Sequence, residues 1–167
     1  MNAIQKIKVR QLIDWKAAFI AGLAGGVISF TTNLILSSWL LDSPWLLTRI
    51  ISSIVLGESV LPPPASFSWL VLLASLFIHL LLSVLFAGLI AAVVHQWGII
   101  ISFIGGALMG LAFYAIAFYT FSMLFPWFFT FRNWIFVVMY ILYGAFTGSV
   151  YELLEVEKYV ELKEEGA

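Results

Sequence analysis

Long apolar runs separated by short polar or proline-rich segments dominate the chain. About 20 apolar residues in a helix cross the ~30 Å hydrocarbon core of a bilayer, because a helix rises 1.5 Å per residue. The pattern therefore predicts an all-α membrane protein, a bundle of four transmembrane helices. The predicted spans cover residues 17–41, 68–94, 99–125 and 134–151, which together with their connections form a membrane domain over residues 17–151.

A shorter amphipathic segment, residues 45–56, lies between the first two predicted spans. Apolar side chains such as Leu47 and Ile50 fall on one side of a helix, and polar ones such as Thr48 and Ser52 fall on the other. The segment is too short to cross a bilayer. We predict an outer interfacial or re-entrant amphipathic helix that lies against the bundle.

The two ends of the chain are polar. Residues 1–16 are expected to form a short amphipathic helix on the membrane surface, and the acidic tail 152–167 is expected to continue the fourth helix into water. Six of the positive charges fall on the side of the termini, against Arg49 and Arg132 on the other side. The excess of positive charge on cytoplasmic loops then places both termini in the cytoplasm.

Small residues recur at a spacing of four in the spans, and the predicted topology places them in the cytoplasmic half. Lipid tails give no hydrophobic drive for helix association, so close backbone approach must supply it. We predict a tightly packed waist there, and a wider outer half whose aromatic and polar side chains either fill the space or line a crevice. The predicted packing residues are Gly22, Gly26, Gly88, Gly106, Gly110, Gly144 and Gly148.

The amino-acid composition argues against several classes of function. Of the 167 residues, 63% are hydrophobic and 10% are charged, whereas soluble domains carry roughly 25% charged residues. The net charge of −1 gives no reason to expect nucleic acid, and the absence of cysteine excludes thiolate chemistry. No nucleophile–base pair, carboxylate pair, metal-ligand cluster or phosphate loop is found. We therefore expect no enzyme activity, no metal site and no cofactor.

His79 is the candidate for chemistry, because it is the one ionisable side chain of ordinary pKa deep inside a predicted span. An unpaired polar group in hydrocarbon is costly, so His79 must face a partner. Either it is a neutral structural histidine bonded to Asn33 or a tyrosine, or it contacts a ligand, a quinone or haem. Residues of similar depth or one turn away complete the candidate binding set: His79, Asn33, Tyr114, Ser75, Ser83 and Tyr140.

The other histidine, His95, cannot share a ligand with His79. Sixteen residues turn it by about 160° and displace it by ~24 Å along a helix, so we interpret it as a turn residue. Cationic and aromatic residues of the outer loops are expected to anchor the protein at the lipid headgroups. These are Arg49, Arg132, Trp127 and Trp134.

Several short motifs, most of them in the loops, make this chain resemble a group of other proteins. The motifs are a triple-proline loop, a Phe-Tyr pair, a Phe-Pro-Trp-Phe turn and an Arg-Asn-Trp triplet, at residues 60–67, 118–119, 125–128 and 132–134. Together with His79, they make the chain similar to an uncharacterised group of small four-helix bacterial membrane proteins. The resemblance covers most of the chain from the first to the fourth span. It implies the four-helix fold and a bacterial inner membrane.

Two functional hypotheses follow. The first is a non-catalytic accessory or structural subunit of a larger respiratory or other energy-transducing membrane complex, which would contact the lipid bilayer and other membrane subunits or further copies of itself. The alternative is a small oligomeric transporter or channel for a neutral or lipid-like solute, or a protein that contacts quinone or haem through His79.

Overall fold

The computed structural model describes residues 8–162, and four long helices dominate it. They are α1 (Trp15–Leu40), α3 (Trp69–Val94), α4 (Gly98–Ala115) and α5 (Trp134–Leu154). Helices α1, α3 and α5 are each long and apolar enough to cross a membrane, and so is α4 with the turns that extend it to Met123. The four-span helical fold is therefore confirmed, and the chain is a multi-pass membrane protein.

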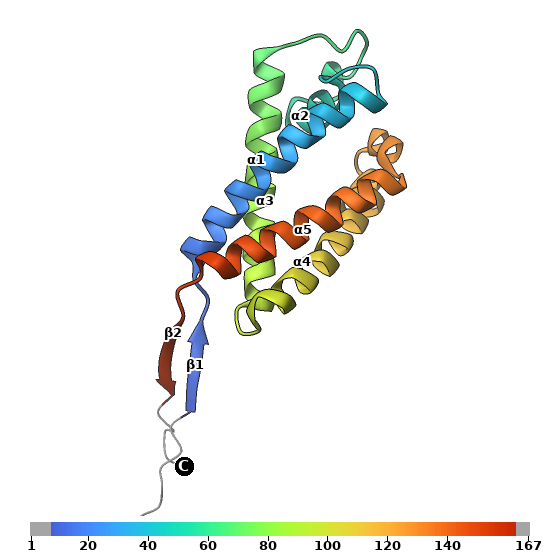
Figure 1. Cartoon of the computed structure of the whole chain (residues 1–167). Helices are drawn as coiled ribbons and strands as arrows, with labels where there is room; N and C mark the ends of the chain where they lie inside the picture. The colour runs from blue at the N-terminus through green and yellow to red at the C-terminus, as the bar shows by residue number, and fades with distance from the viewer. Residues whose placement is uncertain (1–7, 163–167) are drawn as a thin grey trace, which may run out of the picture.

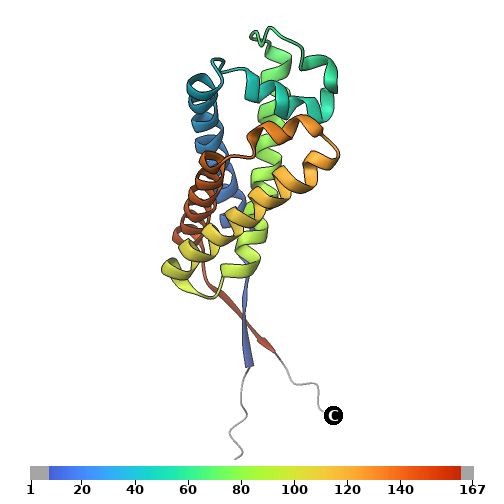
Figure 2. The same cartoon turned by 90° about the vertical axis from the view of Figure 1, so that its right-hand side faces the viewer.

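The helices form two pairs, α1 with α3 and α4 with α5 (Figures 1 and 2). The pairs meet where α1 contacts α5 and where α3 contacts both α4 and α5. One end of the bundle holds the start of α1 and the end of α5. Two short strands leave the bundle there, so we call it the ribbon end. The opposite end holds α2 and several short helical turns, and we call it the loop end.

Glycines set the closest helix contacts. A Cβ built on Gly106 would collide with the carbonyl oxygen of Gly144, and one built on Gly22 would lie 2.7 Å from the Val84 Cα. Such contacts place two backbones against each other, which is how small residues hold membrane helices together. The same holds for three more predicted packing residues, Gly110, Gly144 and Gly148. A Cβ on Gly26 would instead meet side chains of α3, with the Ser83 Cβ and the Leu80 Cδ2 both at 2.9 Å.

Gly88 does not make such a contact. A Cβ there would meet only the Trp15 ring, at the ordinary van der Waals distance of 3.6 Å. Gly88 therefore lies beside a side chain of α1 and makes no close contact with its backbone. The sequence signal was a small residue near others, but its side of α3 faces no neighbouring backbone.

The third span is not a continuous α-helix. Helix α4 ends at Ala115 and passes into a π-helical turn, Ile116–Thr120 (η2), and then into the 3₁₀ turns Phe121–Met123 (η3) and Pro126–Phe131 (η4). A π turn shifts backbone carbonyls out of the α-helical pattern. The Arg132 Nε donates to the Phe118 carbonyl over 2.6 Å and so binds one of them.

Helix α2 (Leu46–Leu56) lies at the loop end and is followed by the 3₁₀ turn Glu58–Val60 (η1). Its polar side is not turned away from the protein, because Thr48, Ser52 and Ser53 are all buried. The Ser53 hydroxyl donates to the Ile50 carbonyl over 2.6 Å and accepts from the Trp127 Nε1 over 2.8 Å. The amphipathic helix is present as a helix, and its position at a membrane surface stays a prediction.

The structure at the two ends of the chain differs from two predictions. Residues 8–12 form a strand, β1 (Lys8–Leu12), which pairs antiparallel with β2 (Lys158–Leu162). The N-terminal segment is therefore no surface helix over these residues, and α5 does not continue through the tail but ends at Leu154. Residues 1–7 and 163–167 of both predicted segments lie outside the described range.

Asp14 holds the two strands at the bundle. Its Oδ1 accepts hydrogen bonds from the backbone N–H groups of Lys16 (3.0 Å) and Ala17 (3.1 Å), which caps α1. Its Oδ2 accepts from the Val156 N–H over 3.2 Å. One carboxylate thus fixes both the start of α1 and the segment that follows α5.

Candidate ligand-binding pocket

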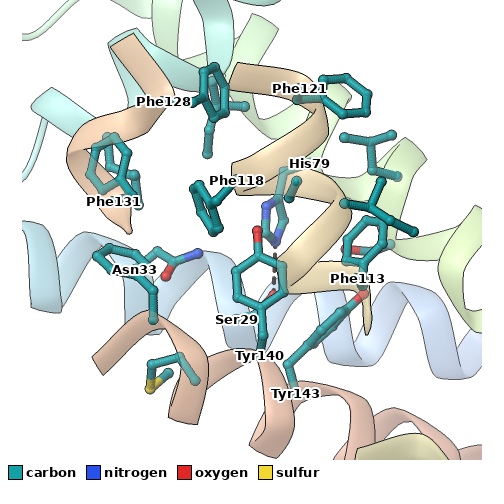
Figure 3. A pocket seen from close by; sticks show the side chains of 18 of the residues that line it. Ser29, Asn33, His79, Phe113, Phe118, Phe121, Phe128, Phe131, Tyr140 and Tyr143 are labelled. Carbon is teal, nitrogen blue, oxygen red and sulfur yellow. Dashed lines mark hydrogen bonds between the residues drawn. The ribbon is translucent and has the colours of Figure 1, made fainter. Parts of the chain in front are cut away.

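A cavity of about 120 Å³ lies between the two helix pairs (Figure 3). It is on the loop side of the glycine contacts. Helix α1 shows how it arises. Gly22 and Gly26 meet α3 closely, and Ser29 and Asn33 follow on the same side of the helix and line the cavity. The pocket therefore begins where the small residues end and larger side chains hold the helix pairs apart.

His79 lies on α3 at the boundary of this pocket. Its Nε2 is 2.8 Å from the Ser29 Oγ and 3.1 Å from the Gly26 carbonyl oxygen. The ring also packs against Phe30, with 5.3 Å between ring centroids. His79 therefore ties α3 to α1, and the prediction that its partner is Asn33 or a tyrosine is wrong.

Other polar groups in the pocket lack partners. The Tyr143 Oη is buried and has no hydrogen-bond partner among the described residues. The Asn33 amide and the Tyr140 hydroxyl also line the pocket, and no hydrogen bond joins either to another described residue (Figure 3). Leaving a buried donor or acceptor unsatisfied costs about 1–3 kcal/mol. These groups are therefore available for hydrogen bonds to a bound molecule.

The walls of the pocket are aromatic and aliphatic. The Phe118 ring lies 5.4 Å from the Tyr140 ring, and Phe113 stacks on Phe86 with 4.4 Å between ring centroids. None of the lining side chains among the described residues is charged. The apolar lining residues, in chain order, are Leu47, Ile51, Ile54, Leu82, Phe113, Ile116, Ala117, Phe118, Phe121, Phe128, Phe131, Phe136 and Met139.

The pocket brings together four of the six predicted binding residues: His79, Asn33, Ser83 and Tyr140. It leaves out the other two. Tyr114 packs behind the wall, with its ring 5.1 Å from that of Phe118 and 5.9 Å from that of Tyr140. Ser75 is fully buried, and its hydroxyl donates to the Leu72 carbonyl of its own helix over 2.9 Å.

Sequence reasoning missed Ser29 and Tyr143. Ser29 continues the ridge of Gly22 and Gly26 by one further turn, so the spacing of that ridge was a usable signal. Tyr143 follows Tyr140 by three residues and shares its side of α5. The phenylalanines of η3 and η4 carried no such signal, because they lie outside the regular helix.

The loop-end arginines bind the protein itself. The Arg49 guanidinium donates to the carbonyls of Val60 (2.7 Å) and Ser66 (2.9 Å), and so holds the proline loop. The Arg132 side chain bonds to Phe118 and lies over the Tyr119 ring, 4.4 Å from its centroid. Their guanidinium groups thus serve loop structure, and a contact of either group with lipid headgroups stays a prediction.

The two predicted tryptophan anchors differ from each other. Trp127 is half-buried and bonds to Ser53 of α2, so it too serves the contact between loop-end segments. Trp134 is 73% exposed at the start of α5. Of the four predicted anchors, Trp134 is therefore the one whose side chain stands free at the surface of the bundle.

The ribbon end has its own polar cluster. The Tyr151 hydroxyl (2.9 Å) and the Gln11 amide (3.3 Å) donate to the Glu155 Oε1. Burial raises the pKa of Glu155, whereas the Ala17 N–H keeps the pKa of Asp14 below its ordinary value of 3.8. Residues 8–162 contain no group of three histidine or acidic side chains placed to hold a metal ion.

Comparison of the chain with protein-family models, with curated proteins and with solved structures gives no match. The function is therefore inferred from the geometry of the pocket.

Proposed function

We propose that this protein binds a neutral, lipid-like molecule in the pocket between its helix pairs, as a small membrane carrier or transporter would. The observation that supports this most is the combination of an uncharged aromatic wall with polar groups that have no hydrogen-bond partner among residues 8–162, above all the Tyr143 hydroxyl. Ligand sites are typically apolar, with a few placed polar groups that fix orientation.

The size of the cavity fits part of such a molecule. An engineered apolar cavity of about 150 Å³ takes up benzene, so about 120 Å³ holds a ring-sized head group or a short length of chain. The remainder would extend out of the bundle. Ile116 lines the pocket and is 49% exposed, so the wall at the π-helical turn is about one side chain thick. We propose that the ligand enters there from the lipid.

The proposed setting is a bacterial inner membrane with both chain ends in the cytoplasm, where the pocket falls in the outer half of the bilayer. The geometry gives less support to haem, because a cavity of about 120 Å³ holds a benzene-sized group and has no room for the much larger haem macrocycle.

Photolabelling tests the proposal. The purified protein, in detergent or in lipid nanodiscs, is exposed to a photoreactive lipid analogue, and the labelled peptides are identified. We expect labels to concentrate on the pocket-lining parts of α1, α3 and α5. The variant Ala117→Trp fills the pocket and should lose that labelling. Its control, Ala115→Trp, lies on the exposed side of α4 and should not. Labelling that is spread over all lipid-facing surfaces and unchanged in Ala117→Trp would contradict the proposal.

A second candidate is the accessory subunit, and the two-stranded ribbon is the feature that favours it. Within residues 8–162 the sheet consists of β1 and β2 alone, and it stands clear of the bundle (Figure 1). Unpaired strand edges are templates for pairing with another chain. Purification from native membranes in mild detergent should then retain another subunit. A monodisperse free protein would argue against this role.

A further inference from the structure

We propose, on the basis of the lipid-binding function above, that the pocket selects a ligand carrying a hydroxyl group. The expected class is a long-chain or isoprenoid alcohol or an acylglycerol, in preference to the matched ether, ketone, acid or amine.

The contacts of His79 settle which ring nitrogen carries the proton. The Gly26 carbonyl oxygen only accepts hydrogen bonds, and it lies 3.1 Å from the Nε2. The Ser29 hydroxyl donates to the same carbonyl over 3.2 Å, so its oxygen is free to accept from the Nε2 at 2.8 Å. All three contacts are satisfied together when the proton of a neutral ring is on the Nε2.

The Nδ1 then carries a lone pair and no proton. Among the described residues the Nδ1 of His79 has no hydrogen-bond partner, and its side chain lines the pocket (Figure 3). A lone pair in an apolar pocket calls for a donor. The molecule that fills this pocket should therefore bring an O–H or N–H group to His79.

The neighbouring groups require a hydrogen-bond acceptor in the same ligand. The hydroxyls of Tyr140 and Tyr143 and the Asn33 amide can donate hydrogen bonds into the pocket. A ligand hydroxyl meets both needs, since it donates to His79 and its oxygen accepts from a tyrosine or the asparagine. An ether or ketone oxygen only accepts and leaves the His79 Nδ1 unpaired.

Charged head groups fit less well. Since the described lining residues include no charged side chain, a carboxylate or ammonium group would be buried without a counter-ion. This separates an alcohol from the fatty acid or amine of the same chain length, which have similar apolar surface.

Competition against the photoreactive lipid analogue tests the inference. A primary alcohol, its methyl ether, and the acid and amine of equal chain length are compared on the wild-type protein. We expect the alcohol to displace the probe at about tenfold lower concentration than the ether, the loss that one net hydrogen bond produces. An isoprenoid alcohol and a diacylglycerol, run in parallel, identify the source of the hydroxyl by which of the two displaces the probe at the lower concentration.

The variant His79→Leu should reduce the preference for alcohol over ether to within about twofold, because both ligands then lack the acceptor. Its fold is checked by thermal unfolding, and if it does not fold, the wild-type comparison still decides. Equal competition by alcohol and ether overturns the hydroxyl inference while the pocket remains a lipid site. If no competitor displaces the probe from the pocket peptides, the proposed function fails as well.

Discussion

The two halves of the bundle are built on opposite principles, although the same four helices run through both. At the ribbon end, α4 and α5 approach so closely that a Cβ on Gly106 or Gly148 would strike the backbone of the other helix. At the loop end, phenylalanine and tyrosine rings separate the helix pairs, and a cavity with unpartnered polar groups remains. We infer that one half stabilises the fold and leaves the other half free to bind.

The change occurs within a few residues. Along α1, Gly22 and Gly26 lie against α3, and Ser29, one turn later, already faces the pocket and binds His79. A membrane protein gains no hydrophobic energy from bringing helices together in lipid. Close contact in one half therefore has to support the separation in the other.

The largest effect is expected where backbones touch. Gly144→Leu places a side chain against Gly106 and Gly110 of α4, where a Cβ alone would lie 2.8 Å from the Gly110 Cα. We expect a loss of about 3 kcal/mol or more in the free energy of unfolding. It is measured by denaturation in mixed detergent micelles.

The matched control for this change is Gly88→Leu. Its Cβ meets only the Trp15 ring at 3.6 Å, so the expected change is within about 0.5 kcal/mol. Equal losses at Gly88 and Gly144 would show that the glycine contacts of α4 and α5 are not what stabilises the ribbon-end half.

The second effect concerns the loop end. Arg132→Met removes the donor to the Phe118 carbonyl and the contact with the Tyr119 ring. A hydrogen bond from a charged group contributes about 2 kcal/mol, and we expect a loss of that order. Hydrogen exchange should rise in residues 116–131 and stay unchanged at the glycine contacts. Arg132→Lys keeps the charge but not the planar fork, and should recover only part of the loss. Uniform exchange over the whole chain would contradict a local role.

A third prediction has the opposite sign. Because the Tyr143 Oη is buried without a hydrogen-bond partner in the described part of the chain, Tyr143→Phe should raise the free energy of unfolding of the ligand-free protein by about 1 kcal/mol. Tyr151→Phe at the ribbon end loses the hydrogen bond to Glu155 and should lower it by a similar amount. Thermal unfolding of the two variants measures the difference. Destabilisation by Tyr143→Phe would mean that its hydroxyl is already satisfied.

The smallest effect is expected at the cap of α1. Asp14→Ala removes the carboxylate that accepts from Lys16, Ala17 and Val156, and should cost about 1 kcal/mol at pH 7. The folded-state pKa of Asp14 is lowered, so the ionised form stabilises the fold above its ordinary value of 3.8. The difference between variant and wild type should shrink as the pH falls below that value. A difference that grows on acidification would contradict this assignment.

Much of the fold could be predicted from apolar blocks alone, because each span satisfies its backbone hydrogen bonds internally and needs no partner to be recognised. The ribbon could not be predicted in this way. Residues 8–12 fit a helix or a strand locally, and the strand is chosen only because Arg10 and Gln11 pair with Val160 and Tyr159 at the far end of the chain. Strand pairing of this kind depends on non-local contacts that a local pattern does not contain.

The depth of the site residues in the membrane could be predicted from the sequence, but the direction in which their side chains point could not. Counting residues from the helix ends placed Asn33, His79 and Tyr114 at one depth, and two of the three do line the pocket. Depth says nothing about which way a side chain faces, so Tyr114 was included and Ser29 was not. The π-helical turn at Ile116–Thr120 changes the direction in which the following side chains point. Counting residues along a regular α-helix does not predict that change.

The pairing of β1 with β2 also has a consequence for synthesis. Strand β1 is made before every helix, and its partner strand is made after all of them. At 5–20 residues per second, β1 waits roughly eight to thirty seconds for β2. The two strands meet only if an even number of helices has crossed the membrane, because an odd number would leave them on opposite faces. A paired ribbon in the finished protein therefore requires that an even number of helices has crossed the membrane.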